Sequence, residues 1–211
     1  MAPDTFANLA AANQQLSLTR TFDDEEQQRR AAIALAAKDL ARNHGYQGVT
    51  VREVARLAEV SPVTIYRYFG SKDGILRHLM VEWAIAVVEN LYATAETRRG
   101  SVAHRISTGM QSVIEWAGDD VELLSAGMTA ITSSRVDGVG VGVDSYRPLF
   151  VELARGCLGD PGWQDRTGAA HILGHVYIAC LLDLTAGRTS LTTVQQNMAT
   201  AATLLLRDVR S

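Results

Sequence analysis

The stretch "SPVTIYRYFGSKDGIL", residues 61–76, combines the signals of a short helix with a high density of aromatic and basic side chains. Ser61 is a favoured residue for capping a helix start. Pro62 suits the first helical position, because its φ is fixed and its missing N–H would have no partner there. Gly70 is a favoured residue just after a helix end. The stretch therefore predicts a helix over residues 62–69.

Two further helix signals precede this stretch. A first helix is expected from near Thr21, with acidic residues in its first turn, to Gly45. Thr50 and Glu53 form a capping box at the start of a second short helix, which ends by Glu59. Three helices then fit within about fifty residues, and the last two are separated by a turn of about three to four residues. This is the spacing of a helix-turn-helix.

Basic residues are concentrated in this part of an otherwise acidic chain. Residues 29–80 hold nine Lys or Arg and four Asp or Glu, a net charge of +5. Residues 1–28 carry one Arg and five acids, and residues 81–211 carry ten basic and fourteen acidic residues, so each of these parts has a net charge of −4. A basic block within a chain of net charge −3 indicates a localised surface for a polyanion.

A helix in this setting can enter the DNA major groove with its N-terminal residues at the base edges. Val63 and the methyl group of Thr64 can contact a thymine methyl group, and the Thr64 hydroxyl can reach a base or a phosphate. Arg52 can reach a guanine edge or a phosphate. Ile65 and Phe69 are expected to face the helical core. Phosphate contacts are expected from Ser61, Tyr66, Tyr68 and Lys72.

The sequence "GYQGVTVREVARLAEVSPVTIYRYFGSKDGIL", residues 45–76, resembles the DNA-binding domain of the tetracycline-repressor (TetR) family of regulators. The resemblance extends over about residues 27–80, with "GVTVREVA", "VSPVTIYRYF" and "SKDGIL" in family order. One departure is Glu59, where the family usually has Gly; a left-handed conformation there would cost about 1–2 kcal/mol. The resemblance implies phosphate contacts from Ser61, Tyr66, Tyr68 and Lys72, and base contacts from Arg52, Val63, Thr64, and Arg67 or Tyr68.

The rest of the chain also has helical patterns. We therefore predict an all-α fold with an N-terminal three-helix helix-turn-helix DNA-binding domain and a C-terminal helical ligand-binding and dimerisation domain. The expected division is a flexible tail over residues 1–20, the DNA-binding domain over 21–71 and the second domain over 72–211. Residues 136–145, "VDGVGVGVDS", are expected to form a loop. Further helices are expected near residues 72–98, 102–116, 120–134, 146–157, 166–187 and 190–208.

The family resemblance implies a small-molecule pocket and a homodimer in the second domain. The segment 171–187 is apolar nearly all round, so one side can cover a pocket while another meets a second copy. We expect a homodimer through helices 166–187 and 190–208, and a small lipophilic effector that releases a palindromic double-stranded DNA operator. The pocket candidates are Trp83, Val87, Met110, Ile114, Trp116, Met128, Tyr146, Phe150, His171, His175 and Tyr177, although each can instead be an ordinary core residue.

Three alternatives stay open. The second domain can serve dimerisation alone, without a natural ligand, or form the core of a large monomer. An all-helical enzyme using His171, His175 and Asp183 is a remote alternative, because no pair of nucleophile and base is visible. The two histidines have the i, i+4 spacing of metal ligands, but no third ligand is evident, so no metal is expected.

The resemblance implies a regulator that is not an enzyme and needs no cofactor. Cys157 and Cys180 have no metal or redox spacing, which favours a reduced, cytoplasmic protein with buried thiols. The chain has no signal-peptide pattern and no apolar stretch of about 18 residues, so no membrane segment is expected.

Overall fold

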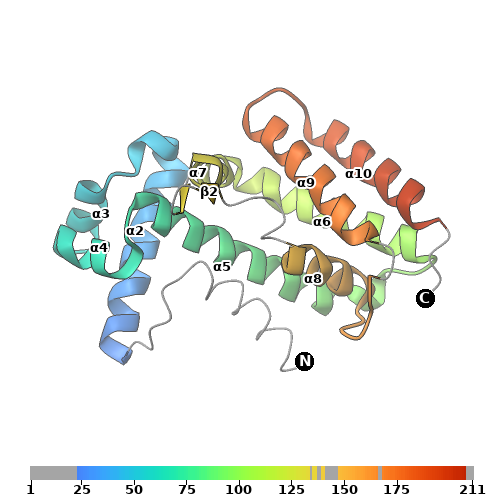
Figure 1. Cartoon of the computed structure of the whole chain (residues 1–211), viewed down its shortest axis with the longest axis horizontal. Coiled ribbons are helices and arrows are strands. Elements are labelled where there is room, and N and C mark those ends of the chain that lie inside the picture. The colour runs from blue at the N-terminus through green and yellow to red at the C-terminus, as the bar shows by residue number, and fades with distance from the viewer. Residues whose placement is uncertain (1–22, 134, 137–138, 141–146, 166–167, 208–211) are drawn as a thin grey trace. The chain divides into compact units, whose positions relative to one another are not determined.

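The computed structural model describes residues 23–133, 135–136, 139–140, 147–165 and 168–207 (Figure 1). These residues confirm the predicted all-α class, apart from a short antiparallel ladder between β1 (Arg135–Val136) and β2 (Val139–Gly140). Apart from Arg135, this ladder falls in the segment 136–145 that was expected to be a loop. The helices are α2 (Asp24–Gly48), α3 (Val51–Leu57), α4 (Pro62–Phe69), α5 (Lys72–Ala93), α6 (Val102–Asp119), α7 (Val121–Ser133), α8 (Arg147–Leu158), α9 (Ala169–Thr185) and α10 (Leu191–Leu206), with a 3-10 turn, η1 (Ala95–Thr97).

The helix starts follow from local capping. Thr50 Oγ1 accepts a hydrogen bond from the Glu53 N–H at 3.2 Å, and Ser61 Oγ accepts one from the Thr64 N–H at 3.1 Å. These two contacts confirm the predicted caps of α3 and α4, and Ser71 caps α5 in the same way. The predicted start near Thr21 lies outside the described residues, and within them Asp23 caps α2.

Two helix ends differ in part from the predictions. Gly45 has a φ of 61° and a ψ of −166°, which are not helical, so the regular helix is interrupted there as predicted, although a short helical segment continues α2 to Gly48. The predicted helix over 72–98 ends earlier, at Ala93, and η1 follows it. Gly70, by contrast, ends α4 with a φ of 73°, as its position after the helix predicts.

The chain forms two compact units, and α5 contributes residues to both. The first unit contains α2, α3, α4, the part of α5 up to Trp83, and residues 120–141 with α7. In this unit α2 packs against α7 and α3, and α3 packs against α4. A shared core buries Ile33 of α2, Val54 of α3, Ile65 of α4, Leu76 of α5 and Leu123 of α7. The long-range docking of α7 therefore places a helix that we assigned to the second domain beside the helix-turn-helix.

The second unit is built from the end of α5, α6, α8, α9 and α10. Within it α6 packs against α10 and α8, while α9 packs against the same two helices. Gly174 of α9 permits one of these approaches, because a Cβ there would lie only 2.1 Å from Phe150 Cδ2 of α8. Gly109 of α6 does the same for Cys157, at 2.4 Å from Sγ. Small residues thus set the spacing of α6, α8 and α9.

The two helices predicted to form a dimer have apolar residues on more than one face. α10 buries Val194, Met198, Ala202 and Leu206 at a regular spacing of four. On the other side, Ile172 of α9 is 47% exposed and Leu204 of α10 is 59% exposed. Both cysteines are buried free thiols, as predicted. Within the described ranges, none of the helices has the length and apolar character that crossing a membrane requires.

Candidate functional site

The face of α4 that points away from the core carries the predicted reading residues. Val63 is 74% exposed and Tyr66 is 56% exposed, although both are large apolar or aromatic side chains. Ser61 is also exposed, and its hydroxyl lies 2.9 Å from that of Thr64. On the opposite side Ile65 is fully buried, as predicted. The helix therefore has one face for packing and one face that presents methyl, hydroxyl and phenol groups to a partner.

Two further predicted contact residues lie on the neighbouring helices. Arg52 is exposed on α3. Lys72 is half-buried at the start of α5, where its Nζ lies 3.6 Å from the centre of the Tyr46 ring and donates a hydrogen bond to the Tyr46 carbonyl oxygen at 3.1 Å. The Tyr46 hydroxyl donates to Asp73 at 2.8 Å. Tyr46 thus orients the lysine, a positioning role that the sequence did not indicate.

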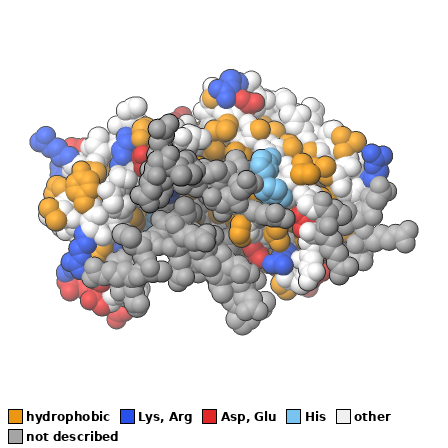
Figure 2. Space-filling model, viewed as in Figure 1, with side chains coloured by type: hydrophobic (Ala, Val, Ile, Leu, Met, Phe, Trp, Pro, Cys, Tyr) orange, Lys and Arg blue, Asp and Glu red, His pale blue; other side chains and the backbone are white. Residues whose placement is uncertain are grey.

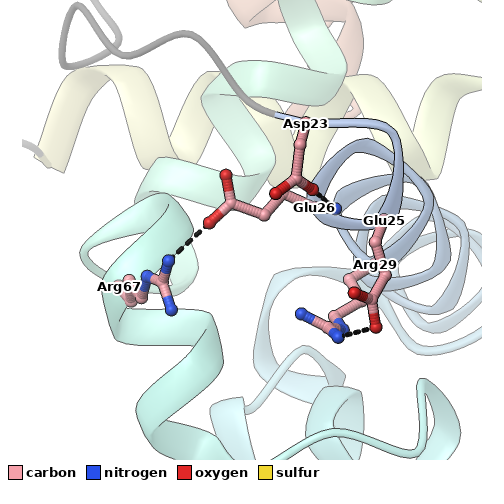
Figure 3. Close-up of polar contacts among 5 residues, drawn as sticks. All are labelled: Asp23, Glu25, Glu26, Arg29 and Arg67. Atoms are coloured by element: carbon pink, nitrogen blue, oxygen red, sulfur yellow. Dashed lines mark hydrogen bonds and ion pairs between the residues drawn. The ribbon is translucent and has the colours of Figure 1, made fainter.

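Arg67 is engaged within the chain. Its guanidinium group forms an ion pair with the carboxylate of Glu26, which belongs to the first turn of α2 (Figure 3). The Glu26 side chain is 10% exposed, whereas that of Arg67 is 50% exposed. In the same turn Asp23 caps the helix and Glu25 pairs with Arg29 (Figure 3). The acidic residues that favour the start of α2 also neutralise two of the basic residues counted toward the DNA surface.

Tyr68 belongs to the core rather than to the exposed face. The residue is only 6% exposed and packs with the other buried residues of the first unit. Its carbonyl oxygen accepts a hydrogen bond from Arg30 at 2.9 Å, and a hydrogen bond with its side chain is the largest cause that raises the pKa of Arg29. Phe69, expected to face inward, is only partly buried, and the Arg30 guanidinium lies 4.6 Å from the centre of its ring. The assignment of Tyr68 to the exposed face is therefore wrong, whereas Phe69 packs against the core but is not fully buried.

The turn between α3 and α4 is tight. The Val60 N–H donates to the Ala55 carbonyl at 3.0 Å, and Glu59 between them has a φ of 54°. This left-handed residue after a helix end is usually glycine, because an L side chain crowds the backbone there. Glu59 therefore adopts the left-handed conformation whose cost was considered from the sequence.

A small cavity lies within the second unit, between α6, α8 and α9. Its free volume is about 20 Å³, and three of the predicted pocket residues line it: Met110, Phe150 and Tyr177. The Tyr177 hydroxyl is buried and has no hydrogen-bond partner within the described parts of the chain. Burial raises the pKa of this phenol, so it stays protonated and can donate a hydrogen bond. The remaining lining residues, which the sequence did not single out, are Ile106, Leu153, Ala154, Ala170, Leu173 and Gly174.

The other predicted pocket residues lie elsewhere. Trp116 is 40% exposed on α6, and Met128 belongs to the first unit. Val87 and Ile114 are buried and Trp83 is partly buried, but none of the three lines the cavity, while Tyr146 lies outside the described residues.

The two histidines meet each other rather than the cavity. The rings of His171 and His175 are 4.5 Å apart in an edge-to-face arrangement, and the ring of His175 contacts the His171 carbonyl oxygen at 3.0 Å. In the part of the chain that the structure describes, no cluster of three or more His, Cys, Asp or Glu residues is arranged to hold a metal ion.

A capped recognition helix, a tight turn and an exposed row of hydroxyl, methyl and basic groups define a helix-turn-helix DNA-binding protein. Residues 33–79 match the family of bacterial regulatory proteins known as the tetR family. The matched segment runs from α2 to α5 and contains the helix-turn-helix, so this part of the chain resembles the N-terminal domain of that family.

Known proteins resemble the chain over most of its length. The transcriptional repressor KstR of Mycolicibacterium smegmatis is 28% identical over 200 residues, which cover 90% of this chain and 93% of that repressor. A TetR regulator from Rhodococcus sp. RHA1 has the same fold, with a TM-score of 0.71, 19% identity and coverage of 88% of this chain and 100% of the other. FadR of Thermus thermophilus, a repressor crystallised with lauroyl-CoA, gives a TM-score of 0.61 at 19% identity, with 86% and 95% covered.

Proposed function

We propose that this protein is a ligand-responsive homodimeric repressor that reads a palindromic operator through α4. The observation that carries the DNA-binding part is the exposed face of α4, on which more than half of the surface of both Val63 and Tyr66 is exposed. Val63 and Thr64 read bases, while Ser61, Tyr66 and Lys72 contact phosphates and Arg52 reaches a base or a phosphate. Tyr68 shapes the core behind them.

The dimer would form through the outer faces of α9 and α10. Figure 2 shows apolar side chains and histidines together over these helices. Ile172 and Leu204 are the most exposed large apolar side chains there, and an isologous four-helix contact would bury both. Two copies of α4 related by a two-fold axis would then match half-sites about one turn of DNA apart.

The cavity supports a ligand with an apolar body and one hydrogen-bond acceptor. Apart from the Tyr177 hydroxyl, its lining side chains are apolar, so a carbonyl or thioester oxygen on an acyl chain would suit it. The Thermus thermophilus relative holds lauroyl-CoA, which has this character. Because the free volume is about 20 Å³, room for about one water molecule, an acyl chain would have to displace lining side chains. Displacement of α8 and α5 would then move Lys72 at the start of α5.

The small size of the cavity also favours a second candidate, a DNA-binding dimer without a natural ligand. In that case the helices of the second unit serve dimerisation alone, and the cavity is a packing defect. The two candidates differ in their response to a ligand. Only the first predicts that a ligand both stabilises the protein and lowers its affinity for DNA.

A mobility-shift titration with DNA flanking the gene of this protein tests the DNA-binding part. We expect saturable, salt-sensitive binding, and its absence would refute the proposal. Lauroyl-CoA then serves as the probe for the ligand part. We expect it to raise the melting temperature and to lower operator affinity by about 5–150-fold.

A matched variant is Tyr177→Phe, which removes the buried hydroxyl but keeps the ring. It should weaken the response to lauroyl-CoA while leaving operator binding without ligand unchanged. If lauroyl-CoA and shorter acyl-CoA probes change neither melting temperature nor DNA affinity, the second candidate holds.

A further inference from the structure

A pocket at the start of α6 collects three arginines. It opens to solvent, has a volume of about 390 Å³, and is lined by η1, the segment that joins η1 to α6, and the end of α8. Every lining residue belongs to the second unit. The charged side chains among them are Arg98, Arg99, Arg105 and Glu96, which gives three positive groups against one negative.

Among the described residues, the three guanidinium groups have no carboxylate partner. None of Arg98, Arg99 and Arg105 forms a salt bridge with any residue that the structure describes, although Glu96 lines the same pocket. In contrast, Arg155 of α8 forms a salt bridge with Glu152. Positive groups that are gathered and partly desolvated without a counter-charge are unfavourable by themselves. An anion from outside the chain would supply what is missing.

Arg98 contributes charge and holds the pocket together. It is only 7% exposed, and its guanidinium donates to the carbonyl oxygens of Cys157 at 3.0 Å and Gly156 at 3.2 Å, and to that of Leu91. These acceptors, at the end of α8 and near the end of α5, are neutral carbonyl oxygens, so no carboxylate compensates the positive charge. Burial is the largest cause that lowers the pKa of Arg98, and repulsion from Arg105 lowers this pKa as well.

Arg99 and Arg105 have N–H groups that donate no hydrogen bond to described residues. Arg105 donates through Nη2 to the Leu158 carbonyl, but its Nε is buried and has no hydrogen-bond partner in the described ranges. Arg99 is exposed and forms no hydrogen bond with described residues. The positive end of the α6 dipole, which begins at Val102, adds to the potential at the same place.

We propose that this pocket binds a phosphate group, with Arg99 and Arg105 as direct contacts and Arg98 as a fixed charge behind them. Guanidinium groups suit phosphate because their N–H groups match its oxygens in pairs. The assignment goes beyond the proposed function, since it requires neither DNA nor a change in DNA affinity. The phosphate can come from a free anion such as pyrophosphate or from the head group of an amphipathic ligand.

Calorimetric titration of the full chain with pyrophosphate, at constant ionic strength made up with chloride, tests the site. We expect saturable binding at one site per chain. Arg99→Gln should weaken it by about tenfold through loss of a charge-assisted contact, and Glu96→Gln should tighten it by removing the lone acid. Arg188→Gln is the matched control, because Arg188 is an exposed arginine outside the pocket and its loss changes the net charge equally.

Opposite effects of the Arg99 and Glu96 variants, with an unchanged control, support the site. Absent or non-saturable binding would overturn it, and so would an equal loss in Arg99→Gln and Arg188→Gln. A second arm identifies the source of the phosphate. If decyl phosphate binds about a hundredfold more tightly than inorganic phosphate and is displaced by decanol, the phosphate belongs to the head group of an amphipathic ligand. If decyl phosphate and inorganic phosphate bind with equal affinity, the natural ligand of the pocket is a free anion.

Discussion

Replacing Glu59 by glycine should stabilise the protein. Glu59 follows the end of α3 with a φ of 54°, and the Val60 N–H bonds back to the Ala55 carbonyl at 3.0 Å. This hydrogen bond fixes the turn, so the residue between cannot relax out of the left-handed region. An L side chain costs about 1–2 kcal/mol there. Glycine removes that cost, but it loses more backbone entropy on folding, which lowers the stability by about 0.5–1 kcal/mol.

The net gain in the free energy of unfolding should therefore be about 0.75 kcal/mol, the difference between the midpoints of these two ranges. For a chain of this size, about 1 kcal/mol corresponds to a rise of about 2–4 °C in melting temperature. Urea unfolding and thermal melts at one fixed protein concentration measure both quantities, because a dimer makes them concentration-dependent.

Glu59→Ala is the matched control. Both variants remove the same carboxylate, which is exposed and forms no hydrogen bond or ion pair with described residues. Only glycine relieves the backbone, so alanine should give no comparable gain. If the two variants are equally stable, the effect comes from the charge and the reasoning from backbone strain is refuted.

Three further changes test packing and recognition. Gly174→Ala should lower the free energy of unfolding by about 1–3 kcal/mol in urea titrations, because the added methyl group would lie 2.1 Å from the Phe150 ring. Thr64→Ala should cost about 1–3 kcal/mol at one base pair in competition assays with altered operators. Lys72→Ala should instead weaken cognate and random DNA alike and lower the salt slope by about two, one for each half of the dimer, and equal behaviour of these two variants would contradict the roles assigned to them.

The sequence predicted the features that depend on neighbours in the chain. The caps by Thr50 and Ser61 act over three residues, and the positive φ of Gly70 and Glu59 follows from a single helix end. The burial of Ile65 follows from its place on a short amphipathic helix. These local rules were enough to locate the helix-turn-helix.

Contacts between distant residues were not predictable in the same way. Arg67 meets Glu26 across 41 positions, and Arg42 meets Asp120 across 78. Nothing in the spacing of α4 shows that Tyr68, rather than Phe69, turns most fully into the core. The cavity was not predictable for the same reason, because Met110, Phe150 and Tyr177 come from three helices whose docking the sequence does not specify.

The count of basic residues overstates the charge that DNA can meet. Several of the nine Lys and Arg in residues 29–80 already pair with acids, and two of these acids lie before residue 29 and a third at 120. The ion pairs of this block are Arg29–Glu25, Arg42–Asp120, Arg56–Glu53 and Arg67–Glu26. If only Arg52 and Lys72 neutralise phosphates in each half of a dimer, the logarithm of affinity should fall with the logarithm of salt with a slope of about −4.

Glu26→Gln isolates one of these pairs. It releases the Arg67 guanidinium on α4 from its carboxylate, so each half of the dimer gains a cation that can neutralise a phosphate, and the salt slope should steepen by about two. Glu115→Gln makes the same change in net charge on α6 of the other unit and should leave the slope unaltered. An equal change in both variants would mean that net charge governs the slope. No change in either would mean that Arg67 stays away from the phosphates even when it is free.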